Sequence, residues 1–533
     1  RKNVKKQLAL RVLSTAALVA MVSSIATAAF AAEYNVAKGS VEIVAKDGIQ
    51  SITQRDDTGA FVKDENGDID HRPDDDITLT TKNKDTGETE TTSNTVTITA
   101  ENKGDTANVT LKDVHIETES SWNNSGSAPI EIKGNGDTNL ELNGDNTVLS
   151  GDRHHAAIEK ADKNGTGTLT IKDDLNDDNS TPKDKDENGN AVGGDTGKLL
   201  AGGYGDGAGI GGGYNDITDL SYANTSNITI KGGEITARGG YEDSAGIGGG
   251  KGQGGSNITI RGGNVKAIPG AEAAGIGGGF KGNGTDISIE GGTVYAESGG
   301  GSGGTAAIGG GRVEGNGENI QITGGDITLK KAGADDIGIG GKGIEIPVAD
   351  TFGGSLTYLD ADGNKDTTKT NIEKYGPVVN GKAVNSLNKD KILNGALRYD
   401  PATKILSLNT DAESYIGNLT IYAPNTTVDL DGGTYSVLQG KLVIEDAADV
   451  TLTSTEARAV FGDTNITCTG KLRITCENIA VDGNLTVNNA SSVELIGKND
   501  NGGTVTGAAV FNNTDEVTIQ NKDATKGAAH SIS

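Results

Sequence analysis

The sequence predicts an all-β fold, namely a right-handed parallel β-helix with three short strands in each coil. One observation is the hexapeptide AGIGGG, which recurs at 208–213, 245–250 and 274–279. Another is a segment of alternating apolar and polar residues followed by two glycines. It occurs as NITIKGGEITA, NITIRGGNVKA, DISIEGGTVYA and NIQITGGDITL, starting at Asn227, Asn257, Asp286 and Asn319. The two patterns interleave, and no unit has enough apolar residues to form its own core, so successive units must stack as coils.

Stacking at the ~4.8 Å spacing of neighbouring strands would align the isoleucines of successive units. The alternating segments give one interior row, which consists of Ile228, Ile258, Ile287 and Ile320. The glycine motifs give a second row, which consists of Ile210, Ile247, Ile276, Ile308 and Ile339. We expect the Asn or Asp that begins each alternating segment to occupy an inward corner and to bond to its copy in the next coil.

The glycines of the hexapeptide have two interpretations. A tightly packed corner that requires positive φ takes glycine in every coil. Alternatively, stacked glycines form a flat strip without side chains, which an extended ligand can approach closely.

The N-terminal part of the chain is typical of an exported protein. Residues 1–31 combine a basic start, an apolar stretch and a final Ala-Phe-Ala, which predicts a signal peptide and a secreted mature protein outside the cytoplasm. We expect no transmembrane segment in the mature chain. Residues 32–93 are expected to cap the helix. The glycine-repeat β-helix is expected at 94–345, with an acidic insertion at 172–197 and an early copy of the hexapeptide, HHAAIE, at 154–159.

The C-terminal part predicts further β-structure without the glycine motif. Residues 346–395 are expected to form a connector with a β-hairpin around Asp362-Gly363. Renewed alternation predicts a second, less regular β-helical stack at 396–521. We expect residues 522–533 to be a polar tail that is cut short.

The chain is acidic, with a formal net charge of −27. Residues 1–31 carry five basic groups and no acidic one, so removing them takes the charge to −32. A nucleic-acid partner is therefore disfavoured, whereas neutral or cationic polymers are favoured. The oligomeric state is left open.

The motifs NVTLKDVHI, LELNGDNTVLSG, GTLTIK, GAGIGGG with NITIKGGEITA, and YDPATKILSLN are distinctive as a set. Over roughly residues 95–520 the chain resembles the glycine-rich repeat surface proteins that anaerobic, mostly Gram-positive bacteria secrete. The resemblance implies a β-helical fold and a carbohydrate-binding or adhesin-like role. We therefore expect a secreted, non-enzymatic surface protein that binds a carbohydrate polymer or a host ligand.

Aromatic residues beside the glycine motifs and strand ends are the candidate ligand-binding residues. They are Tyr204, Tyr214, Tyr241, Phe280 and Tyr295. Amphipathic rings of this kind can stack on sugar faces, although they can equally serve only to cover corners.

The acidic insertion has the spacing of a calcium-binding loop, with Asp in place of the final Glu. The candidate ligands are Asp184, Asp186, Asn188 and Asp195. The alternative is a solvated acidic turn, and no cofactor other than calcium is expected.

A polysaccharide lyase or glycoside hydrolase is the first alternative function, because pectin lyases and polygalacturonases share the parallel β-helix. The triplet Asn-Thr-Asp occurs at 409–411 and 513–515, but the His-Gly and Arg-Ile-Lys elements of polygalacturonases are absent. No catalytic residue is therefore assigned. A structural spacer is the second alternative.

Two short features leave their roles open. His154-His155 beside Asp152 could bind a metal or act as a base, although a surface pair is the simpler interpretation. Cys468 and Cys476 fall on inward positions, where they either form a disulfide or act as two small apolar side chains.

Overall fold

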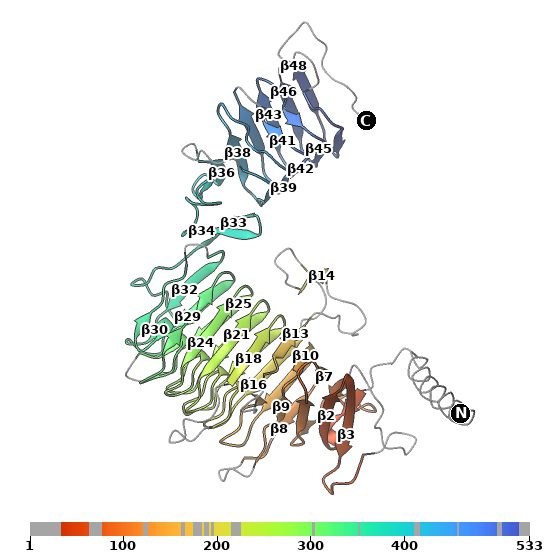
Figure 1. The fold of residues 1–533 in the computed structure, drawn as a ribbon, viewed down its shortest axis with the longest axis vertical. Helices are drawn as coiled ribbons and strands as arrows, with labels where there is room; N and C mark the ends of the chain where they lie inside the picture. The colour runs from red at the N-terminus through yellow and green to blue at the C-terminus, as the bar shows by residue number, and fades with distance from the viewer. Residues whose placement is uncertain are drawn as a thin grey trace, which may run out of the picture.

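The computed structural model describes residues 33–62, 77–120, 126–160, 166–173, 184–185, 191–192, 197–214, 225–300, 304–349, 352–409, 416–455, 458–497 and 504–521. The predicted signal peptide and the C-terminal tail lie outside these residues. The described chain is a right-handed parallel β-helix built almost wholly of strands, as the repeats predict. The strands form two successive stacks, from Glu33 to Leu359 and from Lys374 to Asn521 (Figure 1).

Each regular coil of the first stack contributes one strand to each of three sheets. Sheet 1 contains β1 (Glu33–Asn35), β4 (Ile77–Thr80), β7 (Thr106–Lys112), β10 (Asp137–Asn143), β13 (Leu169–Lys172), β18 (Thr225–Ile230), β21 (Gly255–Ile260), β24 (Gly284–Ile289), β27 (Gly317–Glu318) and β28 (Gln321–Ile322). Sheet 2 contains β5 (Thr91–Thr92), β8 (His115–Glu117), β11 (Asp145–Leu149), β16 (Lys198–Gly202), β19 (Glu234–Arg238), β22 (Asn264–Ile268), β25 (Thr293–Glu297), β29 (Asp326–Lys330) and β32 (Ser355–Leu359). Sheet 3 contains β3 (Ile49–Arg55), β2 (Ser40–Lys46), β6 (Val96–Ala100), β9 (Ile130–Gly134), β12 (Ile158–Lys160), β17 (Ile210–Gly211), β20 (Ile247–Gly248), β23 (Ile276–Gly277), β26 (Ala306–Gly309), β30 (Ile337–Gly341) and β31 (Ile344–Glu345).

The predicted isoleucine rows form the core of the first stack. The glycine-motif row is confirmed, because its isoleucines pair in register from coil to coil and are buried. Ile158 of HHAAIE pairs with Ile210, so this segment is an early copy of the motif, as expected. In the other row Ile228, Ile258 and Ile287 are in register and buried, whereas Ile320 is half-buried at the end of sheet 1.

The expected inward position of the Asn and Asp residues is wrong. Asn227, Asn257, Asp286 and Asn319 have φ of 61°, 51°, 54° and 51°. This left-handed conformation, which Asn and Asp tolerate better than other side chains, bulges the strand and turns the side chain outward. The bond to the copy in the next coil is present nonetheless. The Asn257 amide donates to Asn227 Oδ1 at 2.6 Å, and the Asn319 amide donates to Asp286 Oδ1 at 2.6 Å.

The hexapeptide glycines are required by the backbone. Gly248 has φ of +133°, and a Cβ there would lie 2.0 Å from the carbonyl oxygen of Gly277 in the next coil. The glycines of all three motifs are buried. The interpretation of an exposed, side-chain-free strip is therefore wrong, and the tight corner explains the motif.

Both ends of the first stack differ from the expected boundaries. Strands β1, β2, β4 and β5 already belong to the three sheets, so coils begin well before residue 94. The closing strand is β3, which runs antiparallel to β2. A 3-10 turn, η1 (Val36–Lys38), connects β1 and β2. At the other end the expected turn at Asp362-Gly363 is present, but the strand before it, β32, is the last strand of sheet 2.

The second stack is less regular than the first. Two hairpins begin it, β33 (Lys374–Val379) with β34 (Lys382–Asn385) and β35 (Leu397–Asp400) with β36 (Ile405–Leu408). Two parallel sheets follow. One adds β37 (Leu419–Tyr422), β39 (Leu442–Ala447), β42 (Thr464–Cys468), β45 (Leu485–Asn488) and β47 (Ala509–Asn512), and the other adds β38 (Thr427–Asp431), β40 (Val450–Ser454), β43 (Lys471–Cys476), β46 (Ser492–Gly497) and β48 (Val517–Asn521). The third side is reduced to β41 (Val460–Phe461) and β44 (Val481–Asp482).

Cys468 and Cys476 lie in different sheets of this stack, in β42 and β43. Both are buried thiols, so the candidate disulfide is not formed. They pack in the core of the stack among aliphatic residues, as small apolar side chains do.

Candidate functional site

The two loops that flank sheet 3 meet at one corner of the first stack. Each coil has one isoleucine of sheet 3 that pairs in register with the next coil. We call the residue four positions before this isoleucine the incoming residue. We call the residue four positions after it the outgoing residue. The outgoing residues that carry a side chain are Tyr214, Lys251, Phe280 and Arg312, and the last one, after Ile339, is Gly343. The incoming residues of the coils that precede them are His154, Asp206, Asp243 and Glu272.

A backbone hydrogen bond joins these two columns in every coil. The N–H of each outgoing residue donates to the carbonyl oxygen of the incoming residue in the preceding coil. The pairs are Tyr214 to His154 at 2.7 Å, Lys251 to Asp206 at 3.0 Å, Phe280 to Asp243 at 2.9 Å and Arg312 to Glu272 at 3.0 Å. The corner therefore repeats with the same register as the core.

Four of the five candidate aromatic residues lie at this corner. Tyr204 and Tyr241 come from incoming loops and contact each other edge to face, with ring centroids 5.4 Å apart. Tyr214 stacks on the His154 ring at 4.6 Å. Tyr241 and Tyr214 are exposed, with relative exposures of 52% and 36%, and Phe280 is half-buried. The rings are thus accessible to a ligand along several coils.

Tyr295 does not belong to the corner. It lies in β25 of sheet 2, opposite Lys266 and Thr328 in the neighbouring strands. Its hydroxyl donates to Glu297 Oε1 at 2.6 Å, and the Lys266 ammonium lies 5.1 Å from its ring centre. These contacts place it on a different side of the coil.

A network of charged side chains lies between the tyrosines. Arg153 contacts Asp206 at 3.2 Å and Glu242 at 2.6 Å. Lys251 contacts Asp206 at 3.3 Å, Glu242 at 3.5 Å and Asp243 at 2.8 Å. Farther along the same corner Arg312 pairs with Glu272. The cations and carboxylates of the corner therefore neutralise one another locally.

Two carboxyl groups of this network have shifted pKa values. Burial raises the pKa of Asp206, and the positive charge of Lys251 offsets this increase only in part. Burial also acts to raise the pKa of Glu242, but the hydrogen bonds from Arg153 and Asp206 and the charges of Arg153 and Lys251 together outweigh it, so the pKa is lowered. The two neighbouring carboxyl groups thus have pKa values shifted in opposite directions.

The histidine pair is divided between two partners. His154 stacks on Tyr214, whereas His155 Nδ1 lies 3.0 Å from Glu159 Oε2. Burial acts to lower the pKa of His155, but the hydrogen bond with Glu159 and the negative charges of Glu159, Asp152 and Glu131 together outweigh it, so the pKa is raised. Asp152 accepts from the backbone N–H of Gly126 and His154 and so fixes the turn. Among the described residues no group of three or more His, Cys, Asp or Glu side chains is placed to hold a metal.

The candidate calcium loop lies largely outside the described residues. Asp184 belongs to β14 (Asp184–Lys185), which pairs antiparallel with β15 (Ala191–Val192). Asp186, Asn188 and Asp195 are outside the part of the chain that the structure describes. The calcium site stays a prediction.

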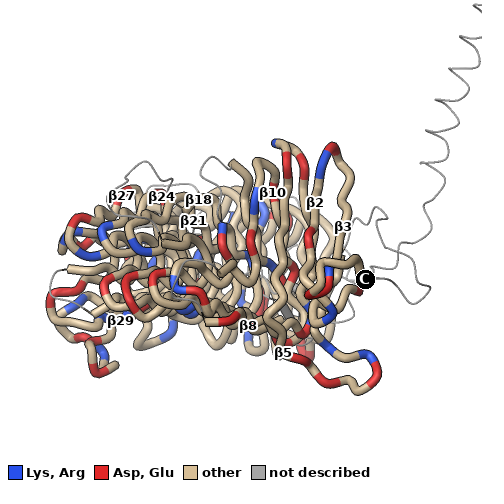
Figure 2. The backbone as a smooth tube through the Cα atoms, turned by 90° about the horizontal axis from the view of Figure 1, so that it is seen from below, with Lys and Arg blue, Asp and Glu red and all other residues tan. Residues whose placement is uncertain are grey.

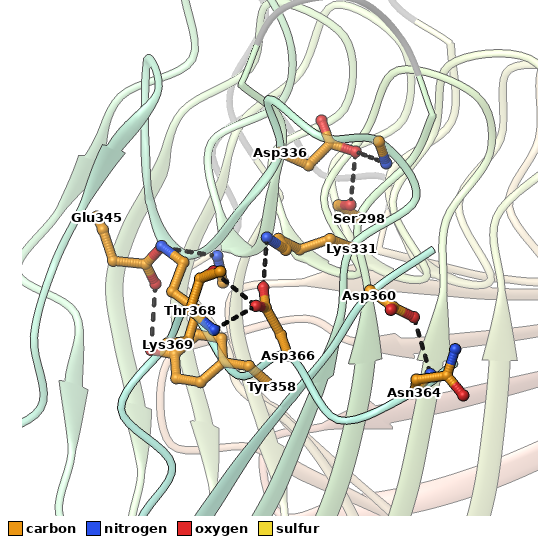
Figure 3. Close-up of polar contacts among 12 residues, drawn as sticks. Ser298, Lys331, Asp336, Glu345, Tyr358, Asp360, Asn364, Asp366, Thr368 and Lys369 are labelled. Carbon is orange, nitrogen blue, oxygen red and sulfur yellow. Dashed lines mark hydrogen bonds and ion pairs between the residues drawn. The ribbon is translucent and has the colours of Figure 1, made fainter. Parts of the chain in front are cut away.

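A polar network closes the end of the first stack rather than forming a site (Figure 3). Glu345 accepts from the N–H groups of Gly338 and Ile339, from the Tyr358 hydroxyl at 3.2 Å and from Lys369 at 2.8 Å. The carboxylate of Glu345 thus satisfies backbone N–H groups of β30 at the end of sheet 3.

Asp366 completes this closure on the neighbouring side. The Lys331 ammonium lies 2.7 Å from its carboxylate, and the Thr368 hydroxyl donates to it at 2.6 Å (Figure 3). The hydrogen bond from Lys331 is the main cause that lowers the pKa of Asp366 to about 2, and those from Thr368 add to it.

A separate groove of about 500 Å³ lies beyond this closure. Its lining is mostly polar and consists of Asp326, Ser355, Thr357, Lys365, Asn371, Ile372, Glu373, Lys374 and Tyr375. It contains one aromatic side chain, whereas the corner presents several in register.

Acidic and basic residues are interspersed over the loops and strand ends of the first stack, where red and blue segments lie close together (Figure 2). The residues that sequence reasoning missed are the charged ones: Arg153, Asp206, Glu242, Lys251 and Glu159. Alignment of the copies on their isoleucines carries the signal, because acidic residues recur at the incoming position and large side chains at the outgoing position.

Comparison with known proteins supports this description. A family model of the beta helix repeat matches residues 228–251, 258–280 and 287–312. Each matched segment begins at an inward isoleucine of sheet 1 and ends at an outgoing residue. No curated protein and no solved structure matches the chain. The matched segments are thus repeats of a parallel β-helix, in agreement with the fold. Among its described residues, no helix has the length and apolar character needed to cross a bilayer.

Proposed function

We propose that this β-helix repeat protein is exported and that it binds a carbohydrate polymer, or a host ligand of similar character, without catalysing a reaction. The observation that carries the proposal is the corner, where Tyr204, Tyr214, Tyr241 and Phe280 are presented in a repeating register beside paired charges. Aromatic faces stack on sugar rings, and carboxylates and cations hydrogen-bond to sugar hydroxyls. The resemblance to secreted glycine-rich surface proteins and the predicted signal peptide support this role.

The repeated register suits an extended ligand. A chain that lies along the corner meets a new outgoing side chain at intervals of ~4.8 Å, one coil at a time. Each contact is weak, but contacts on one chain combine through effective concentration. The acidity of the mature chain favours neutral or cationic polymers over acidic ones.

The test is a panel of plant and host glycans offered to the purified protein and to a Tyr214→Ala/Phe280→Ala variant. We expect binding of at least one neutral polymer and roughly tenfold weaker binding by the variant, since each ring contributes about 0.5–1.5 kcal/mol. Tyr295→Ala is the matched control and should bind like the wild type. Failure of the panel to yield any ligand would leave the structural spacer as the function.

A variant of the groove near Tyr375 distinguishes binding in the groove from binding at the corner. Thr357→Trp would fill the groove without altering the corner. Binding that is lost in Thr357→Trp but retained in Tyr214→Ala/Phe280→Ala would place the ligand in the groove and contradict the proposal.

A glycoside hydrolase is the second candidate, favoured by the opposite pKa shifts of Asp206 and Glu242. Such a pair is typical of a general acid and its partner carboxylate. However, Asp206 is only 2% exposed beneath Arg153 and Lys251, so a glycosidic oxygen could not reach it without displacing both. Incubation of the same glycans with the protein, followed by assays for reducing ends and unsaturated products, tests catalysis. Product formation that Glu242→Gln abolishes would establish the enzyme.

A further inference from the structure

We infer that the polymer bound at the corner is an uncharged, ribbon-like β-1,4-linked polysaccharide that lies parallel to the helix axis, with alternate sugars on Tyr214 and Phe280. The inference rests on the proposed function and adds the class of polymer. It follows from how the four outgoing residues alternate.

Aromatic and cationic side chains alternate along the outgoing column in the order Tyr214, Lys251, Phe280, Arg312. The isoleucines before them are in direct register, so neighbouring members of the column are one coil apart. The two rings are therefore two coils apart, about 9.6 Å at the ~4.8 Å spacing of strands.

A β-1,4-linked chain matches this alternation. Successive sugars of such a ribbon are turned over relative to one another, so every second sugar presents the same face in the same direction. A ribbon along the axis can place one such face on Tyr214 and the next equivalent face on Phe280. The intervening sugar then lies beside Lys251 and the carboxylates of Glu242 and Asp243 that pair with it, to which its hydroxyls can donate. An α-linked chain coils and would leave this straight column after one contact.

The charges of the corner favour an uncharged ribbon. Arg153 and Lys251 are already paired with Asp206, Glu242 and Asp243, so this group contains two cations and three carboxyl groups. An acidic polysaccharide would have to compete with those carboxylates for the same cations. Sugar hydroxyls can instead donate to the carboxylate lone pairs that the ion pairs leave available.

A proline-rich peptide has a similar period, because a polyproline II helix advances ~9.3 Å in each turn of three residues. Proline has no N–H, so such a peptide supplies few donors to the carboxylates of Glu242 and Asp243. Sugars supply donors and acceptors at every unit. The composition of the corner therefore favours the polysaccharide.

The experiment measures binding of the full chain to soluble β-1,4-glucan, β-1,4-mannan and β-1,4-xylan. An α-1,4-glucan, a polygalacturonate and a proline-rich peptide serve as comparisons. We expect binding of at least one β-1,4-linked neutral polymer, at least about tenfold tighter than the three comparisons. Equal or tighter binding of the α-glucan would contradict the inference that the polymer is a β-1,4-linked ribbon. It would leave the proposed function, carbohydrate binding, intact. Tighter binding of polygalacturonate would contradict the inference that the polymer is uncharged. Tighter binding of the peptide would contradict the inference that the ligand is a polysaccharide.

Oligosaccharides of the preferred polymer test the spacing of the rings. Occupation of both rings requires about three sugars, so a trimer should bind several-fold more tightly than a dimer. Phe280→Ala and Tyr214→Ala should each remove most of this increment, because only one ring remains. Tyr435→Ala, which changes an exposed ring of the second stack, should retain it. An increment that persists in both corner variants would overturn the placement on Tyr214 and Phe280. Absence of binding to any carbohydrate would instead contradict the proposed function itself.

Discussion

The backbone N–H of Lys251 donates to the carbonyl oxygen of Asp206 in the preceding coil, and the side chains of the same two residues form an ion pair at 3.3 Å. One residue pair therefore joins two coils through both backbone and side chain. Because Asp206 is buried, its charge depends on the cations around it.

Lys251→Met is expected to destabilise the first stack by about 3 kcal/mol, because it removes a cation from a buried carboxylate. Denaturant or thermal unfolding measures the change. The double variant Lys251→Met/Asp206→Asn should recover part of the loss, since no buried charge then remains at Asp206. Lys46→Met is the control, because the Lys46–Glu101 pair is exposed to solvent and should contribute little to stability. Equal losses in the two single variants would contradict a structural role for the Lys251 pair.

Ile276→Asp is expected to destabilise the protein by several kcal/mol, because the side chain is fully buried between Ile247 and Ile308. Thr259, which alternates with buried isoleucines in sheet 1, is partly exposed and should tolerate Asp. Thermal melts of the two variants check the register. Similar sensitivity at both positions would disprove it.

Val313→Gly is expected to stabilise the protein by about 1 kcal/mol. Val313 follows an outgoing residue and has φ of 79°, a conformation that a β-branched side chain rarely adopts. Gly252 and Lys281 hold the equivalent positions with φ of 78° and 62°. Equilibrium unfolding should show the gain, and Gly252→Val should show a loss of similar size. A loss of stability in Val313→Gly would mean that valine contributes packing that outweighs its backbone conformation.

The ion pair of Asp366 with Lys331 should make the free energy of unfolding decrease as the pH falls into the acid range. Its pKa is about 2 in the folded chain, below the ordinary 3.8, so the folded state binds this proton less readily than the unfolded state. The associated stabilisation is complete above about pH 4 and is lost as the pH falls through about 2. Asp366→Asn should therefore melt at a lower temperature than the wild type at pH 7, with the difference shrinking as the pH falls toward 2. A difference that stays constant across this range would contradict the ionised role of Asp366.

The sequence predicts the core well because isoleucine recurs at the same position of each repeat. Ile210, Ile247 and Ile276 stand in identical hexapeptides, and each fills the same interior position. Strict alternation also predicts which face Thr259 occupies. It fails at Asn257, where a single left-handed residue reverses the side chain that alternation assigns.

The charged part of the corner was harder to predict from the sequence. Asp206 and Lys251 are 45 positions apart in the chain, and the letters at the incoming and outgoing positions differ from coil to coil. Their proximity follows from the helical winding, which the isoleucine rows define only after the coils have been aligned. The candidate aromatic residues stand beside the glycine motifs or the strand ends, and it is the second criterion that includes Tyr295, which lies on another side of the coil.

The antiparallel strand β3 and the hydrogen bonds to Glu345 close the first stack at its two ends, so neither closure depends on how many coils lie between them. A duplication or deletion of one unit by unequal recombination between near-identical copies, such as those beginning at Ile228 and Ile258, would lengthen or shorten the molecule while both closures stay unchanged. Each added unit would bring its own outgoing residue in register with the others. Lineages could therefore change the reach of the corner by whole coils, and vary its residues, without having to evolve a new fold.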